Sequence, residues 1–182
     1  VFINNDANCF ALGEKYYGQV LTSNSMVGLI TGTGMGAGLV LNNRLYSGRN
    51  CAAGELGELP YLDHNYEYYC AGGFFEATWG VSAFETFQKC EQNDPSALER
   101  MMIYGKHLSE AVKLVLYAYD VDTIIIGGSV SKAFEFYSDS LWENLRKTIT
   151  FKKQLLSLVI APSELQNSAI LGAASLYFDS NL

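Results

Sequence analysis

Positive charge is scarce in this chain of 182 residues, in which 12 Lys and Arg stand against 19 Asp and Glu for a formal net charge of −7. A nucleic-acid-binding surface needs a basic stripe that neutralises phosphates. Because the sequence has no run rich in Lys or Arg, we expect no nucleic-acid partner for this chain. An anionic substrate still has a route to binding, through backbone donors or a local basic spot.

Cysteine and long apolar runs are scarce as well. The four cysteines, at positions 9, 51, 70 and 90, form no C-x-x-C pair, so their spacing predicts neither a disulfide framework nor a zinc knuckle. We expect reduced thiols and a cytoplasmic protein. No apolar run approaches the roughly 18 residues that a membrane span requires, and no signal peptide is visible, so we expect no membrane contact.

Proline is limited to 3 residues, and neither internal repeats nor low-complexity linkers occur. What is present is a composition of 49% apolar and 17% charged residues, which is typical of a folded chain with a sizeable core. Val1 stands in place of Met within an apolar triplet that resembles the end of a strand. This opening predicts that the chain starts inside a longer protein.

Apolar runs and capping residues predict an α/β lobe with a mixed sheet, an antiparallel hairpin and flanking helices. The first half contains a short helix capped by Asn5 or Asp6, two strands at 27–31 and 39–41, and a two-residue turn at Asn42-Asn43. A helix near Gly73 continues past Trp79. The second half contains a long helix that starts at Asp94-Pro95, strands at 123–126 and 156–160, and helices capped by Ser131, Asp139 and Ser168.

Four glycines fall within residues 32–38, between two strands and beside Thr33. Such a turn exposes several backbone N–H groups and a hydroxyl in one concavity, and glycine lets an anion approach the main chain closely. It therefore predicts a phosphate-binding turn; the alternative is a tight β-hairpin, and these residues alone do not decide between the two. No G-K-[ST] follows, which excludes a Walker A loop.

A second glycine turn, Gly127-Gly128-Ser129, ends a buried strand, where ligands of open α/β sheets usually gather. Backbone without side chains would let a nucleobase or ribose lie against this turn. An ordinary strand-to-helix turn explains the same residues, and from these residues alone we favour it.

Carboxylates form the third group of candidates. Asp6 stands where a strand meets a helix, and its neighbour Asn5 can both donate to and accept from a sugar hydroxyl. Glu55 and Glu58 lie one helical turn apart if their segment is helical, and Glu76 is near a helix start. Each acid alone is also explained by capping or by solvation. The two histidines, His64 and His107, have no metal partner at ligand spacing and are assigned no chemical role.

Five segments together resemble the ROK family, which contains bacterial sugar kinases and sugar-responsive repressors with the actin-like (ribonuclease-H-like) ATPase fold. They follow one another in family order along essentially the whole chain. The segments are Asn5-Asp6 with the helix up to Glu14, residues 31–38, residues 52–57, residues 126–129 and residues 171–174.

The resemblance implies a role for each candidate residue. Asp6 would be the general base that takes the proton from the attacking sugar hydroxyl. The implied sugar ligands are Asn5, Glu55, Glu58 and Glu76. The implied cofactors are ATP and Mg²⁺, with Thr31, Gly32, Thr33 and Gly34 at the phosphates and Gly127, Gly128 and Ser129 beside the adenosine.

Two departures from the family pattern change what we expect. Family members usually carry a zinc-binding His where this chain has Glu58, and a Cys-rich loop where this chain offers only Cys70. We therefore expect no structural zinc and a loop packed by its aromatic residues instead. The family's Asp-x-Gly-x-Thr phosphate hairpin is also missing, so residues 1–182 are expected to be the C-terminal lobe, with a sugar-side insertion at 50–92 and an N-terminal lobe outside this chain.

The resemblance implies a glucokinase-like enzyme that phosphorylates a hexose or amino sugar, in which this lobe alone is inactive because half of the cleft is missing. The alternative is the ligand-sensing domain of a sugar-responsive transcriptional regulator, and a third possibility is an actin-like scaffold module without a ligand. Family dimers often pair through this lobe, so we expect a homodimer.

Overall fold

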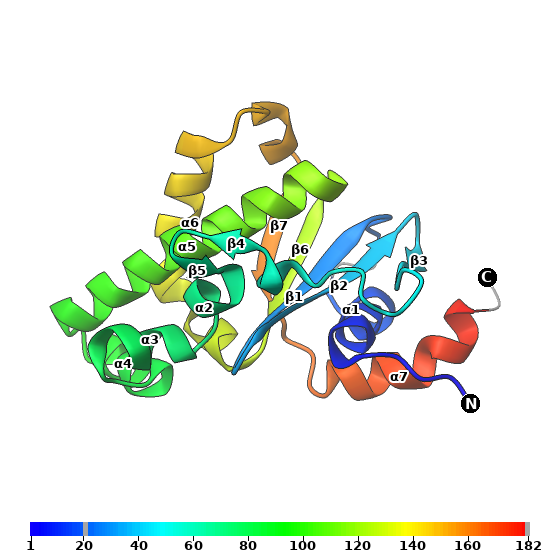
Figure 1. The fold of residues 1–182 in the computed structure, drawn as a ribbon, viewed down its shortest axis with the longest axis horizontal. Coiled ribbons are helices and arrows are strands. Elements are labelled where there is room, and N and C mark those ends of the chain that lie inside the picture. Colours follow the sequence, from blue (N-terminus) through cyan, green and yellow to red (C-terminus); the bar gives the residue numbers. More distant parts are fainter. Residues whose placement is uncertain (20–21, 181–182) are drawn as a thin grey trace.

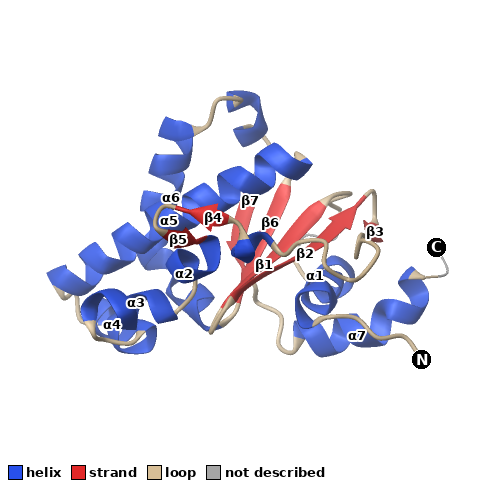
Figure 2. Cartoon of the chain, viewed as in Figure 1, coloured by secondary structure: helices blue, strands red, loops and turns tan. Residues whose placement is uncertain are grey.

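The computed structural model describes residues 1–19 and 22–180 and builds them around a five-stranded sheet with the strand order β3-β2-β1-β6-β7 (Figures 1 and 2). Strand β1 pairs antiparallel with β2 and parallel with β6, which pairs parallel with β7. The strands are β1 (Met26–Thr31), β2 (Met35–Leu41), β3 (Arg44–Leu45), β6 (Thr123–Gly127) and β7 (Val159–Pro162). The mixed α/β class expected from the sequence is confirmed.

Helices cover both faces of this sheet. Helices α1 (Asp6–Tyr17) and α7 (Ser168–Asp179) lie on one face, and α5 (Pro95–Tyr119) and α6 (Phe134–Thr148) lie on the other (Figure 1). The alternation of side chains along each strand divides the core accordingly. The face toward α1 is formed by Met26, Val40 and Ile125, and the face toward α5 and α6 by Val27, Leu29, Leu39, Ile124 and Ile126.

The segment between β3 and α5 forms a small layer of its own beside the sheet. It consists of the 3-10 helix η1 (Leu56–Glu58), the strands β4 (Pro60–Tyr61) and β5 (His64–Asn65), and the helices α2 (Tyr66–Cys70), α3 (Gly73–Trp79) and α4 (Ala83–Glu91). Two further 3-10 helices, η2 (Ser129–Ala133) and η3 (Lys152–Leu155), flank α6.

Several turn and capping predictions are confirmed. Asn42 and Asn43 have φ of 54° and 64°, the left-handed conformation that the hairpin turn demands. The Asp94 carboxylate accepts from the Ala97 amide, so Asp94 caps the 25-residue helix α5. Of the two residues proposed as the first cap, Asn5 holds the position, because its side chain accepts from the Asn8 amide and Asp6 is the first residue of α1.

Other boundaries were predicted wrongly. Asp139 caps nothing, because a single helix, α6, runs through it from Phe134. The helix at Gly73 stops at Trp79, where Gly80 adopts a left-handed conformation. The last strand begins at Val159 and not at residue 156, since η3 ends at Leu155 and residues 156–158 form the connection to the strand. Ser131 lies inside η2 and Ser168 inside α7, so neither is the cap residue itself.

Aromatic residues pack against one another in the segment between β3 and α5, and this packing was predicted from the sequence. Tyr61 stacks on Tyr66 with ring centroids 4.5 Å apart, and the half-buried ring of His107 from α5 lies 4.8 Å from Tyr69. The Tyr61 hydroxyl is 3.2 Å from His107 Nδ1. Within the described residues no three His, Cys, Asp or Glu side chains gather as metal ligands, and no helix is long and apolar enough to cross a membrane.

Partial burial of His107 makes stability depend on pH. Desolvation lowers the pKa of this imidazole, and Glu110 opposes the shift. The folded state therefore binds fewer protons than the unfolded state, in which the pKa is about 6.5. The stabilisation is complete above that value and is lost as the pH falls from it towards the lower folded pKa.

We therefore expect His107→Gln to reduce the difference in unfolding free energy between about pH 7.5 and about pH 5.5, as measured by urea denaturation. His64→Gln is the matched control, because His64 is exposed. An equal pH dependence in His107→Gln and the unsubstituted protein would contradict this expectation.

Candidate functional site

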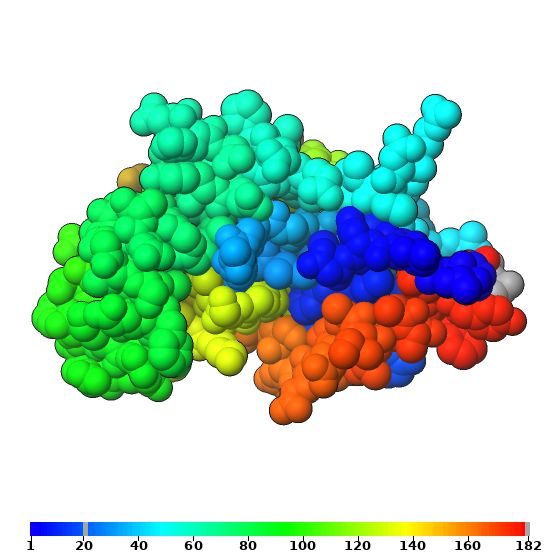
Figure 3. Space-filling view, turned by 60° about the horizontal axis from the view of Figure 1, so that its bottom comes forward, coloured from blue at the N-terminus to red at the C-terminus, as the bar shows by residue number. Residues whose placement is uncertain are grey.

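A groove of about 390 Å³ opens at the edge of the sheet where β1 ends. The parallel strands β1 and β6 both finish at this edge, and α1 begins here, which is where ligands of open α/β sheets usually bind. Figure 3 shows the N-terminal segment, the β1–β2 connection and the segment after β3 meeting on one face. The lining residues are Asn5, Asp6, Ile30, Gly32, Thr33, Gly34, Met35, Gly36, Glu55 and Glu67.

The start of α1 presents Asp6 to this groove. The carboxylate is held by the main chain, since its Oδ1 accepts from the Ala7 amide at 2.9 Å. Asn5 is fixed more tightly, because its Oδ1 accepts from the Asn8 amide and its Nδ2 donates to the Cys51 carbonyl oxygen. The bond to Oδ1 thus sets the orientation of the Asp6 side chain, and Oδ2 remains available to a ligand in the groove.

Residues 32–34, here named the glycine turn, connect β1 to β2 and line the same groove as Asp6. The Gly32 amide donates to the Gly34 carbonyl oxygen at 3.0 Å, which closes the turn. The amides of Thr33 and Gly34 find no acceptor within the described part of the chain. Two main-chain donors and an exposed threonine hydroxyl therefore remain available to an anion.

The other two glycines of this run, Gly36 and Gly38, lie in β2 and pack against α1, and Gly36 also lines the groove. A Cβ on Gly38 would lie 2.2 Å from the Ala7 carbonyl oxygen, and one on Gly36 would lie 3.2 Å from the Ala7 side chain. Both residues belong to β2 and allow α1 to approach the sheet closely. None of the four glycines has a positive φ, so close approach of neighbouring atoms, and not backbone freedom, favours glycine at 34, 36 and 38, while a Cβ on Gly32 would meet only ordinary contacts.

The segment before η1 brings Glu55 to the rim of the groove. Gly54 has φ of 98°, and a Cβ there would lie 2.0 Å from the Ala37 carbonyl oxygen. A Cβ on Gly57 would lie 2.7 Å from the Met35 carbonyl oxygen. Because this backbone presses directly on β2, the exposed side chain of Glu55 reaches the groove while Leu56 is buried.

The second glycine turn lies next to the first. The ideal Cβ position of Gly32 is 3.9 Å from the Ser129 amide nitrogen and 4.0 Å from Gly128 Cα. Gly128 has φ of 87°, a conformation that favours glycine, and its backbone packs against the Thr31 carbonyl oxygen. The two turns therefore form one continuous surface at the ends of β1 and β6.

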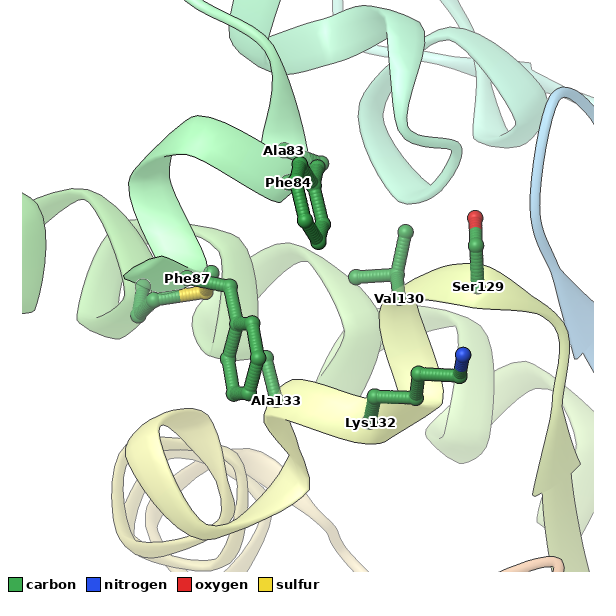
Figure 4. Close-up of a pocket in the computed structure, with 8 residues that line it drawn as sticks. Ala83, Phe84, Phe87, Ser129, Val130, Lys132 and Ala133 are labelled. Carbon is green, nitrogen blue, oxygen red and sulfur yellow. The ribbon is translucent and has the colours of Figure 1, made fainter. Parts of the chain in front are cut away.

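A smaller cavity of about 90 Å³ extends from this second turn, between η2 and α4. Figure 4 shows Phe84 and Phe87 of α4 facing Val130 of η2, with Ser129 and Lys132 at the rim. Its lining is mostly apolar, with a hydroxyl and an ammonium group as the polar contacts. Such a cavity suits a flat, uncharged ring more than it suits a phosphate.

The predicted site residues fall into three groups. Asn5, Asp6, Glu55 and the glycine turn line the groove, and Ser129 lines the smaller cavity. Thr31 and Gly127 are buried, and the Thr31 hydroxyl donates to the Gly127 carbonyl oxygen at 3.2 Å, so these two join the strand ends beneath the surface. Glu58 and Glu76 are exposed and are not among the lining residues of the groove.

Sequence reasoning missed Glu67 as a residue of the groove and Phe84, Phe87 and Lys132 as residues of the smaller cavity. The only signal for Glu67 was an acid within a run of tyrosines. The two phenylalanines had no signal, because a helix face rich in apolar residues is equally typical of a buried core.

The fold and the two adjoining turns define this chain as a lobe of the actin-like ATPase class. The sequence profile of the ROK family matches residues 1–180, and the chain belongs to the ROK family. It is 28% identical to the N-acetyl-D-glucosamine kinase of Vibrio cholerae serotype O1, over 89% of this chain and 60% of that protein. This chain therefore spans less than two thirds of the length of that relative.

Two solved structures share the fold. The ROK hexokinase of Thermus thermophilus is 28% identical, with a TM-score of 0.85 over 100% of this chain and 66% of that one. A ROK family transcriptional regulator, a homologue of the MLC protein of E. coli, has a TM-score of 0.86 at 21% identity, over 98% of this chain and 52% of that one. The second likeness shows the fold alone.

Proposed function

We propose that residues 1–182 form the C-terminal lobe of a sugar kinase that transfers the γ-phosphoryl group of ATP to a hydroxyl of a hexose or amino sugar. The observation that carries this proposal is that Asp6 and the glycine turn line the same groove. A carboxylate and a set of free main-chain donors that line one groove can hold a hydroxyl and a phosphate against each other. The N-acetyl-D-glucosamine kinase and the hexokinase among the relatives support a sugar as acceptor.

Asp6 is the proposed general base. In the transfer step, Oδ2 of Asp6 takes the proton of the sugar hydroxyl while the hydroxyl oxygen bonds to the γ-phosphorus. The bond from that phosphorus to the bridging oxygen breaks, and ADP leaves with the electron pair. The Ala7 amide on Oδ1 keeps the carboxylate in place, which matters because phosphoryl transfer depends mainly on alignment.

ATP would lie across the two glycine turns. The Thr33 and Gly34 amides would donate to the phosphates, and the cavity lined by Ser129, Val130 and Phe84 would receive the adenine ring. Mg²⁺ bound with ATP takes most of its ligands from phosphate oxygens and water, so it does not require a cluster of protein carboxylates. Mg²⁺ would offset the negative charge of the phosphates.

The charge of the groove favours a neutral or cationic sugar. Three carboxylates, Asp6, Glu55 and Glu67, line it, and no Lys, Arg or His of the described residues does so. A sugar with its own carboxylate or phosphate would meet like charge without a counterion. Glu58 and Glu76 stay proposals as further sugar contacts.

The test is an ADP-release assay on the full-length protein with glucose, mannose, fructose, N-acetylglucosamine and N-acetylmannosamine, run beside the isolated chain 1–182. We expect turnover of at least one sugar by the full-length protein and none by the isolated chain. Robust turnover by the isolated chain would contradict the lobe assignment. Light scattering on the same preparation tests the expected homodimer.

The regulator alternative has a different outcome in the same experiment. Sugar binding by calorimetry without any ADP release by the full-length protein would contradict the kinase and support a ligand-sensing domain. If the full-length protein shows no sugar binding and no turnover, the scaffold alternative remains.

A further inference from the structure

Helix α2 and the residues just after it bind the chain at the start and immediately after the end of the glycine turn. Near the start of the helix, Glu67 Oε2 accepts from the Met35 amide at 3.0 Å. Just past its end, the Gly72 amide donates to the Gly32 carbonyl oxygen at 2.8 Å. Gly32, which begins the turn, and Met35, which follows it, are thus both bound by one short segment of the chain.

The Glu67 carboxylate also fills the space above the turn. A Cβ on Gly34 would lie 2.6 Å from Glu67 Oε2, and a Cβ on Gly57 would lie 3.3 Å from Glu67 Cβ. The absence of a side chain at 34 is therefore what allows the carboxylate to reach the Met35 amide. Glu67 and Thr33 together separate the groove from a neighbouring cavity of about 310 Å³.

Helix α2, which carries Glu67, is itself anchored by two contacts. The Tyr104 hydroxyl, fully buried in α5, donates to the Cys70 carbonyl oxygen at 2.8 Å. The stack of Tyr61 on Tyr66 fixes the start of the same helix. A carboxylate mounted on a helix that is held at both ends can fix the position of a loop, because its own backbone has little freedom.

We propose that Glu67 is a positioning residue of the phosphoryl-transfer reaction, acting through the Met35 amide on the glycine turn. This inference rests on the proposed function. By accepting from Met35, Glu67 keeps that amide out of the groove and leaves the Thr33 and Gly34 amides as the donors that face the phosphates. The acceptor oxygen and not the negative charge performs this role, since the charge itself would repel ATP.

The variants Glu67→Ala and Glu67→Gln separate the acceptor from the charge. In the full-length protein, we expect Glu67→Ala to raise the KM for ATP about tenfold, the effect of one lost charge-assisted hydrogen bond, with the KM for the sugar changed much less. Glu67→Gln keeps an acceptor oxygen and is expected to stay within about threefold of the unsubstituted protein. Asp63→Ala, an exposed acid on the same segment, is the matched control and should change neither constant.

A second variant reaches the same contact from the other side. Gly34→Ala places a methyl group against the carboxylate and should displace it from Met35, with a similar rise in the KM for ATP. If both substitutions remove one interaction, the double variant Gly34→Ala with Glu67→Ala should be no worse than either single variant. Additive losses would overturn the proposal.

Amide hydrogen exchange of chain 1–182 tests the contact without any activity. We expect the Met35 amide to exchange faster in Glu67→Ala and to stay protected in Glu67→Gln. Unchanged exchange in Glu67→Ala, or Glu67→Gln as defective as Glu67→Ala, would overturn the positioning role. Absence of turnover in the unsubstituted protein would contradict the proposed function and leave the exchange result to decide the role of Glu67 in holding the turn.

Discussion

Asp6→Asn in the full-length protein should lower kcat by a factor of about 10² to 10⁴, the contribution typical of a positioned general base. The substitution removes the basic oxygen and little else. Asn keeps a carbonyl oxygen that can accept from the Ala7 amide, so the side chain should hold its orientation at the start of α1. The KM for the sugar should therefore change little.

The measurement is steady-state ADP release together with calorimetric titration of the sugar. Asp139→Asn is the matched control, because Asp139 is exposed within α6, outside both the groove and the smaller cavity. Turnover that survives in Asp6→Asn would show that the proton is taken by another group and that Asp6 has been assigned the wrong role.

Gly172→Ala should destabilise the protein by about 2 kcal/mol, although the same substitution in an open helix position is favourable. Helices α1 and α7 pack in backbone contact at this residue. A Cβ on Gly172 would lie 1.7 Å from the Cys9 carbonyl oxygen and 2.7 Å from the Gly13 amide nitrogen, and neither backbone atom can turn aside as a side chain would. The gain in helix propensity of about 1 kcal/mol is smaller than the cost of forcing the two helices apart, which reaches about 3 kcal/mol.

Gly73→Ala is the control for this prediction. Gly73 also lies in a helix, α3, but a Cβ there meets nothing within 4 Å. We expect it to be neutral or stabilising by up to about 1 kcal/mol. Urea denaturation gives both values, and a Gly172→Ala protein as stable as the unsubstituted one would show that α1 and α7 do not approach as closely as described.

Local signals predicted those elements whose structure depends on neighbouring residues. The Asn42-Asn43 turn, the Asp94-Pro95 helix start and the buried strand 123–126 are all where the sequence indicated. A capping side chain or a left-handed turn acts over three or four residues, so its signal is present in the sequence. The prediction at Asp139 was wrong because it used the same local signal. An Asp has the chemistry of a cap wherever it stands, and its immediate neighbours do not show that the helix began earlier, at Phe134.

The candidate site could be predicted only in part. The residues of the groove that belong to short motifs, Asp6, Glu55 and the glycine turn, were identified through the order of those motifs along the chain. Glu67 was not, because its contact with Met35 joins residues 32 positions apart. Phe84 and Phe87 line the smaller cavity with Val130, which lies 46 and 43 positions further along the chain.

By itself, the sequence determined the α/β class, the family and the residue types that the chemistry requires, because each of these is written in short segments and in their order. Only the tertiary structure decided which glycines serve packing, which serve the turn, and which acids reach the groove. It also decided that α2 and the residues just after it bind the chain at both ends of the glycine turn. Those answers depend on which backbones approach within a few ångströms of each other. Such distances arise when β1, β6 and the layer of α2 to α4 assemble, and no pattern of neighbouring residues contains them.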